Sequence, residues 1–143
     1  IKIVTGLWSA SQQAIAFRSN TTSVGSITCS TTSTTYGTSS DYRLKENISI
    51  ISDSILRVKS LNPCRFNFIE EPDKTVDGFI AHEVQEIIPE AVIGEKDELD
   101  FDGSPKYQGI DQSKIVPLLT AALQEAIAKI ELLEQRINIL ENK

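Results

Sequence analysis

The C-terminal segment 111–143 constrains the fold more than any other part of the chain, because it lacks glycine and its apolar residues recur at a regular spacing. The repeat consists of residues spaced alternately three and four apart: Val116, Leu119, Leu123, Ala126, Ile130, Leu133, Ile137 and Leu140. A period of about 3.5 residues, kept for about four heptads, predicts a coiled-coil helix. We expect this helix over residues 110–143, with Asp111 as its N-cap and Pro117 in its first turns, where a missing N–H is tolerated.

This stripe predicts an oligomer, because a single helix would leave it exposed to water. The alternative is a monomeric chain whose amphipathic helix packs on its own domain. β-Branched residues at position a with Leu at position d favour two strands. The stripe is broader than such a seam, however, and the additional residues are Ile115, Leu118, Ala122 and Ile127. The early part of the helix must therefore bury a second face, against its own domain or against further neighbours.

Residues 1–40 differ from the rest of the chain in charge and composition. They carry two charged side chains, Lys2 and Arg18, whereas the remaining residues have 12 basic and 20 acidic groups. Fifteen of the 22 residues in the segment 19–40 are Ser or Thr. This composition fits either a disordered linker or a thin β-stalk that becomes stable when several chains wind together.

Short apolar alternation predicts strands in IKIVTGLW (residues 1–8) and QQAIAFRS (residues 12–19). Gly6, Gly25 and Gly37 are candidate turn positions.

Residues 41–109 predict short elements of both kinds. A helix is expected at 54–58, ended by Asn62-Pro63, and is followed by a strand at 64–69 and a turn at 70–78. A second helix is expected at 81–92; it has Val84, Ile87 and Ile88 on one face and stops near Pro89. A loop or hairpin is expected at 94–109. The fold class is therefore α+β, in which a β-stalk end precedes a mainly helical module.

Composition excludes several classes of function. A net charge of −6 gives no electrostatic drive toward nucleic acid. No apolar run reaches the roughly 18 residues of a membrane span. Cys29 and Cys64 form no CxxC motif, so we expect them to be free thiols and not part of a metal site. No cofactor is expected. The chain contains no Met and starts at Ile1, so we expect a fragment from the C-terminal end of a longer protein.

The sequence TSSDYRLKENI, at the junction of the two halves, contains a candidate catalytic pair. A Ser hydroxyl needs a neighbouring base to act as a nucleophile, and a desolvated Lys amine can be that base. Ser40 and Lys45 are five residues apart, so a turn around Tyr42 would have to bring them together. Solvated loop residues are the alternative, because Ser and Lys occur close together in most proteins.

Three segments, SDYRLKENI, GFIAHEVQEIIPEAV and YQGIDQSKIVPLLTAALQEAIAKIELLEQRI, together resemble the intramolecular chaperone domain of phage endosialidases, tail spikes and tail fibres. The resemblance covers residues 39–143. It implies that the domain drives homotrimerisation of a β-rich fibre and then releases itself by cleavage at a Ser. Carried over to this chain, the nucleophile is Ser40, the base is Lys45, and Asp41 flanks the scissile bond.

Three assignments stay open within this resemblance. Ser39 is a neighbouring hydroxyl, although the Ser-Asp pair and the spacing to Lys45 favour Ser40. His82, in GFIAHEV, either supports the dyad or is a partly buried helix residue that makes one hydrogen bond. Cleavage is expected at the Ser40–Asp41 bond, although the preceding bond is the other candidate.

These observations predict two domains, residues 1–40 as the end of a trimeric β-fibre and residues 41–143 as a self-cleaving serine peptidase and chaperone. The expected partners are two further copies of the chain and the fibre of the same polypeptide, with no nucleic acid, membrane or cofactor. The resemblance implies a virion tail fibre or spike precursor, made in the host cytoplasm and released from its chaperone on maturation. Alternatives are a trimerisation module that does not cleave, and a receptor-binding tip that uses loops such as the one with Tyr107.

Overall fold

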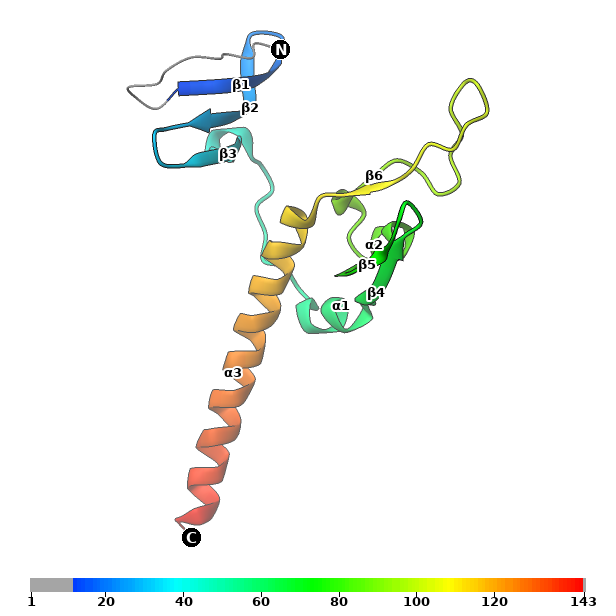
Figure 1. The fold of residues 1–143 in the computed structure, drawn as a ribbon. Coiled ribbons are helices and arrows are strands. Elements are labelled where there is room, and N and C mark those ends of the chain that lie inside the picture. Colours follow the sequence, from blue (N-terminus) through cyan, green and yellow to red (C-terminus); the bar gives the residue numbers. More distant parts are fainter. Residues whose placement is uncertain (1–11, 143) are drawn as a thin grey trace. The chain divides into compact units, whose positions relative to one another are not determined.

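The computed structural model describes residues 12–142, which divide between Ser49 and Ile50 into two compact units. The first unit contains three antiparallel strands in the order β1 (Gln12–Ser19), β2 (Thr22–Cys29) and β3 (Thr34–Thr38) (Figure 1). The strand predicted over residues 12–19 is confirmed, and the Ser/Thr-rich segment forms strands rather than a linker. The strand predicted over residues 1–8 lies outside the described residues.

Local side-chain chemistry sets the turns of this sheet. Asn20 adopts a left-handed conformation (φ 53°) between β1 and β2, which an asparagine tolerates well. Between β2 and β3, the hydroxyl of Ser30 accepts hydrogen bonds from the backbone N–H groups of Thr32 and Ser33. Both turns therefore rest on short polar side chains.

The turns predicted at Gly25 and Gly37 are wrong, because both residues lie inside strands. A Cβ atom on Gly25 would come within 3.0 Å of the carbonyl oxygen of Gly37. Gly25 thus allows two backbones to approach closely, which is a common role of glycine within a strand. Gly6, the third predicted turn position, lies outside the described residues.

The second unit combines three α-helices with two short antiparallel strand pairs (Figure 1). The elements are α1 (Ser54–Ser60), β4 (Cys64–Phe68), β5 (Glu71–Gly78), α2 (Ala81–Gln85), β6 (Val92–Ile93), β7 (Gly109–Ile110) and α3 (Ile115–Glu141). The predicted helix at 54–58, the strand at 64–69 and the loop at 94–109 are confirmed. The α+β class is confirmed as well.

The turn predicted over residues 70–78 is wrong, because β5 occupies most of this segment and pairs with β4. The pairing rests on side chains that face each other across the hairpin. Phe66 lies opposite Val76, and Arg65 pairs with the carboxylate of Asp77 at 2.7 Å. Such cross-strand pairs stabilise a strand whose own sequence is polar.

The helix predicted over 81–92 is shorter than expected. α2 ends at Gln85, and Pro89–Ala91 forms a separate 3-10 turn. Val84 and Ile88 are both about 1% exposed and Ile87 packs beside them, as the predicted apolar face requires.

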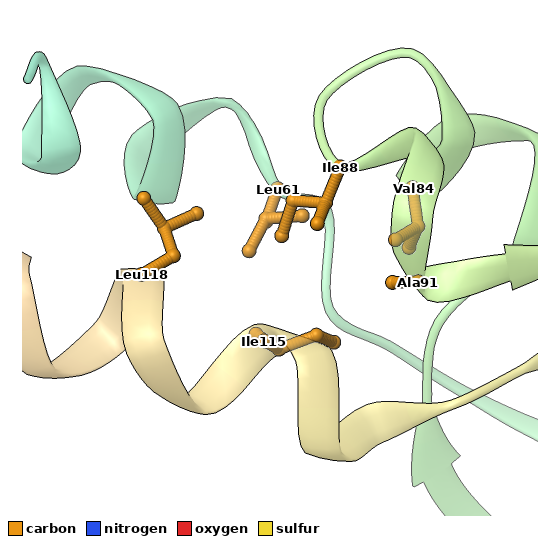
Figure 2. Close-up of a cluster of buried hydrophobic side chains, with 6 residues drawn as sticks. All are labelled: Leu61, Val84, Ile88, Ala91, Ile115 and Leu118. Atoms are coloured by element: carbon orange, nitrogen blue, oxygen red, sulfur yellow. The ribbon is translucent and has the colours of Figure 1, made fainter. Parts of the chain in front are cut away.

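The core of the second unit is a small apolar cluster (Figure 2). Its buried members are Leu61, Val84, Ile88, Ala91, Ile115 and Leu118. They come from the end of α1, from α2 and the turn after it, and from the first turns of α3. The cluster therefore fixes the beginning of α3 on its own unit.

The two faces predicted for α3 are separate in the structure. Ile115, Leu118 and Ala122 are buried within the unit, which is the second face expected from the sequence, whereas Ile127 is 46% exposed. The residues of the 3.5-residue repeat remain largely exposed in the single chain, for example Leu123 at 62%. Asp111 caps a 3-10 turn (Gln112–Lys114) that precedes α3. In the described part of the chain, no helix has an apolar stretch long enough to cross a bilayer.

A polar contact joins α1 to α3. Glu125 of α3 accepts hydrogen bonds from the Ser54 hydroxyl (2.8 Å), the Ile55 N–H (3.3 Å) and Lys129 (2.7 Å). The carboxylate satisfies the N-terminus of α1, where Asp53 provides no side-chain cap. Lys129, Ser54 and the Ile55 N–H, in this order, lower the pKa of Glu125 to about 2.

Candidate active site

The predicted turn around Tyr42 is present and begins directly after Ser40. Residues Tyr42–Leu44 form a 3-10 turn, in which the N–H of Leu44 donates to the Asp41 carbonyl and the N–H of Lys45 donates to the Tyr42 carbonyl, both at 3.1 Å. The backbone becomes extended again at Lys45. This turn shortens the path between positions 40 and 45.

The turn brings the two candidate catalytic side chains together. Lys45 Nζ donates a hydrogen bond to Ser40 Oγ at 2.8 Å. This separation lies within the range expected for a nucleophile and its general base. Both side chains are exposed in the single chain.

Hydrogen bonding distinguishes Ser39 from Ser40. The Ser39 N–H donates to the carbonyl of Val24, and its hydroxyl donates to the carbonyl of Ser23 at 3.2 Å. Ser39 thus continues the pairing of β3 with β2, whereas the Ser40 hydroxyl contacts Lys45. The two neighbouring hydroxyl groups therefore have different hydrogen-bond partners, and the assignment of Ser40 as the nucleophile stays a prediction.

Asp41 makes a contact that sequence analysis missed. Its carboxylate accepts from the Arg43 side chain through Nε (2.9 Å) and Nη2 (2.8 Å), and from the Arg43 backbone N–H (2.9 Å). The Arg43 guanidinium and, secondarily, this N–H lower the pKa of Asp41. Asp41 thereby caps the turn that presents Lys45. The spacing of Asp41 and Arg43, two positions apart in the sequence, could have indicated this contact.

A shallow pocket lies beside the dyad within the first unit. Its lining residues are Ser23, Ser39, Ser40, Asp41, Arg43 and Leu44. The pocket is next to both peptide bonds that flank Ser40.

His82 belongs to the second compact unit, where it lies half-buried on α2. It lines a pocket together with the ends of the 94–108 loop, including Glu98, Lys106 and Tyr107. Within the described residues its side chain makes no hydrogen bond, so the single hydrogen bond expected for a structural histidine is not found. A role for His82 beside the dyad stays a prediction.

Cys29 and Cys64 are free thiols, as predicted. Over residues 12–142, no group of three or more His, Cys, Asp and Glu side chains is placed to hold a metal ion.

Comparison with known proteins connects this geometry to a family. Residues 40–93 match the family model Peptidase_S74, described as chaperone of endosialidase. No curated protein matches the chain. The matched segment begins at Ser40 and includes α1, the β4–β5 hairpin and α2. Over residues 40–93, the chain is therefore similar to the chaperone of endosialidase family.

Proposed function

We propose that this chain is the C-terminal chaperone of a phage tail spike or tail fibre, which trimerises, templates folding of the fibre and then releases itself by Ser40–Lys45 autoproteolysis. The match to the chaperone of endosialidase family supports the chaperone role. The observation that carries the peptidase role is the 2.8 Å hydrogen bond between Lys45 Nζ and Ser40 Oγ.

The proposed chemistry needs only these two side chains. A neutral Lys45 amine takes the hydroxyl proton of Ser40, and the oxygen attacks a neighbouring carbonyl carbon. Lys45 then returns the proton to the departing amide nitrogen, and water hydrolyses the resulting ester. Each chain performs this reaction once, because the scissile bond belongs to the same assembly as the nucleophile.

Ring size distinguishes the two candidate bonds. If Ser40 Oγ attacked its own carbonyl within one chain, a four-membered ring would form. Cleavage of the expected Ser40–Asp41 bond therefore requires the hydroxyl of Ser40 from another chain of the trimer. Attack on the carbonyl of Ser39, in contrast, closes a five-membered ring within one chain.

Assembly provides the environment that a lysine base requires. Desolvation disfavours an ammonium group, whereas the Ser40–Lys45 pair is exposed in the single chain. Burial of the pair between three chains would favour the neutral amine. Cleavage would then take place after assembly and not before it.

This order suits the folding problem of a trimeric β-fibre. Its contacts are mainly between chains and non-local, so they form slowly and leave strand edges exposed. A helical module that trimerises first holds three chains at high effective concentration. Later removal of the module prevents unfolding by the reverse route, so the stability of the fibre becomes kinetic.

Matched variants test the peptidase role on denaturing gels. We expect cleavage in the wild type and in S39A, because the Ser39 hydroxyl bonds to Ser23, and no cleavage in S40A or K45M. Light scattering checks that each variant still assembles. Cleavage in an assembled S40A chain would exclude Ser40 as the nucleophile.

A chaperone that trimerises without cleavage is the second candidate, and the exposure of Ser40 and Lys45 in the single chain favours it. A wild-type chain that assembles but stays at full length would support this candidate.

A further inference from the structure

The turn between Ser40 and Lys45 also holds a two-pronged ion pair. The Asp41 carboxylate accepts from Arg43 through Nε at 2.9 Å and through Nη2 at 2.8 Å, so both carboxylate oxygens face the guanidinium. In this geometry arginine binds a carboxylate with particular specificity. The pair is exposed to solvent, however, and exposed ion pairs add little to folding stability. Stability alone is therefore a weak reason for an arginine at this position.

The place of this carboxylate matters for a lysine base. Asp41 directly follows Ser40, whose Oγ contacts Lys45 Nζ at 2.8 Å, and Ser40 and Asp41 line the same shallow pocket. A carboxylate close to an amine favours the ammonium form, and an ammonium group cannot accept a proton. A free Asp41 carboxylate within reach of the flexible Lys45 side chain would therefore oppose the proposed reaction.

The observed contacts keep the two groups apart. Within residues 12–142, the Lys45 side chain makes one hydrogen bond, to Ser40 Oγ, and no ion pair. The Asp41 carboxylate instead accepts all three of its hydrogen bonds from Arg43, two from the guanidinium and one from the backbone N–H. The guanidinium and then this N–H lower the pKa of Asp41, so the carboxylate stays charged and paired wherever a lysine base can act.

The other charged groups of this unit leave Asp41 as the acid that matters here. In residues 12–49, the charged and titratable side chains besides Lys45 are Arg18, Cys29, Tyr36, Asp41, Tyr42, Arg43 and Glu46. Arg18 donates to the carbonyl of Thr21 at 3.1 Å, in the turn between β1 and β2. Glu46 follows the turn, makes no ion pair within the described residues and does not line the pocket.

We propose that Arg43 is a positioning residue that holds the Asp41 carboxylate away from Lys45 and so keeps the lysine amine available as the base. The inference rests on the proposed autoproteolysis by Ser40 and Lys45 and adds a residue that controls the base from outside the dyad. Loss of the guanidinium would free the carboxylate to pair with the Lys45 ammonium. Loss of the carboxylate would leave the positive charge of the guanidinium unopposed. The two losses should therefore shift the pH dependence of cleavage in opposite directions.

The pH dependence of cleavage in the full chain tests this inference. Chains are assembled at mildly acidic pH, where a lysine base is protonated, and are then transferred to a series of higher pH values. Denaturing gels give the cleavage rate, and light scattering checks that each variant has assembled.

The expected shifts differ in sign. R43Q should raise the pH of half-maximal rate by at least about one unit, which lowers the rate at neutral pH about tenfold. D41N should lower this pH, and D41N/R43Q should return it to near the wild-type value. R43K keeps a positive charge beside Asp41 but lacks the planar fork, so it should cause a smaller upward shift than R43Q. If R43Q does not assemble, R43K and D41N still separate the two directions.

R65Q is the matched control. Arg65 forms the same kind of exposed ion pair with Asp77, through Nε at 2.7 Å and Nη2 at 3.1 Å, but in the β4–β5 hairpin of the second unit. R65Q removes an equivalent ion pair and should leave the pH dependence of cleavage unchanged. Equal shifts in R65Q and R43Q would overturn the inference.

The remaining outcomes also decide the question. If the pair only stabilised the turn, R43Q and D41N would both lower the maximal rate without shifting the pH of half-maximal rate. That result would overturn the inference and leave autoproteolysis by Ser40 and Lys45 intact. A wild-type chain that assembles but is cleaved at no pH would contradict both the proposed peptidase role and this inference.

Discussion

Leu118 offers the sharpest test of how α3 is fixed to its own unit. Its side chain is 2% exposed and lies in the cluster with Leu61, Ile88 and Ile115 (Figure 2). Leu→Ala at a buried site costs about 2–5 kcal/mol. We expect about 2–3 kcal/mol, because the half-buried residues around this small cluster have room to relax. For a domain of 60–100 residues, a loss of this size lowers Tm by about 10–20 °C.

The matched control is Leu132→Ala in the same helix. Both variants replace Leu by Ala in the same helix, so the change in helix propensity is the same. Leu132 is 49% exposed and lies outside the 3.5-residue apolar repeat, so its replacement removes little packing. Thermal unfolding followed by circular dichroism at several protein concentrations measures both variants. L118A should lower Tm at every concentration, whereas L132A should shift it by only a few degrees. Equal Tm values for the two variants would refute the account of the core.

Three further predictions concern the apolar repeat of α3, pH and the sheet. Leu123→Ala removes a side chain of the 3.5-residue apolar repeat that is 62% exposed in the single chain and would be covered in an oligomer. Sedimentation should therefore show a weaker oligomer, and unchanged assembly would contradict the predicted role of this repeat in contacts between chains. The pKa of Glu125 is lowered to about 2 from 4.5, so its contribution to stability is complete above pH of about 4.5 and is lost as the pH falls toward 2. As the pH falls over this range, the urea midpoint of unfolding should therefore decrease less in E125Q than in the wild type. The same change of midpoint with pH in both proteins would contradict a stabilising role of the Glu125 contact. Gly25→Ala should increase amide hydrogen exchange in β2 and β3, because its Cβ atom would lie 3.0 Å from the carbonyl oxygen of Gly37. Gly37→Ala is the control, since its Cβ atom would meet its nearest atom only at 3.7 Å. Equal amide exchange in the two variants would contradict this reasoning.

Local patterns in the sequence predicted the local parts of the fold. The long C-terminal helix followed from its apolar period, and the helix at 54–58 followed from the Asn62-Pro63 stop. The approach of Lys45 to Ser40 was predictable because a single turn separates the two residues.

The features that sequence analysis missed depend on distant partners or on a polar surface. β5 is a strand because β4 pairs with it, although its own sequence resembles a turn. The Ser54–Glu125 contact joins residues 71 positions apart, so no motif indicates it. Gly25 was predicted as a turn because sequence cannot distinguish a glycine that allows a turn from one that allows close backbone contact.

The most direct test of the central claim is the intact mass of the assembled chain, measured for the wild type beside S40A. Self-cleavage at the Ser40–Asp41 bond should give two wild-type fragments, residues 1–40 and 41–143, whereas S40A should give one full-length species. A larger fragment beginning at Ser40 would place the scissile bond before Ser40 and the attack within one chain. A single full-length mass for the assembled wild type would contradict self-cleavage by Ser40 and Lys45.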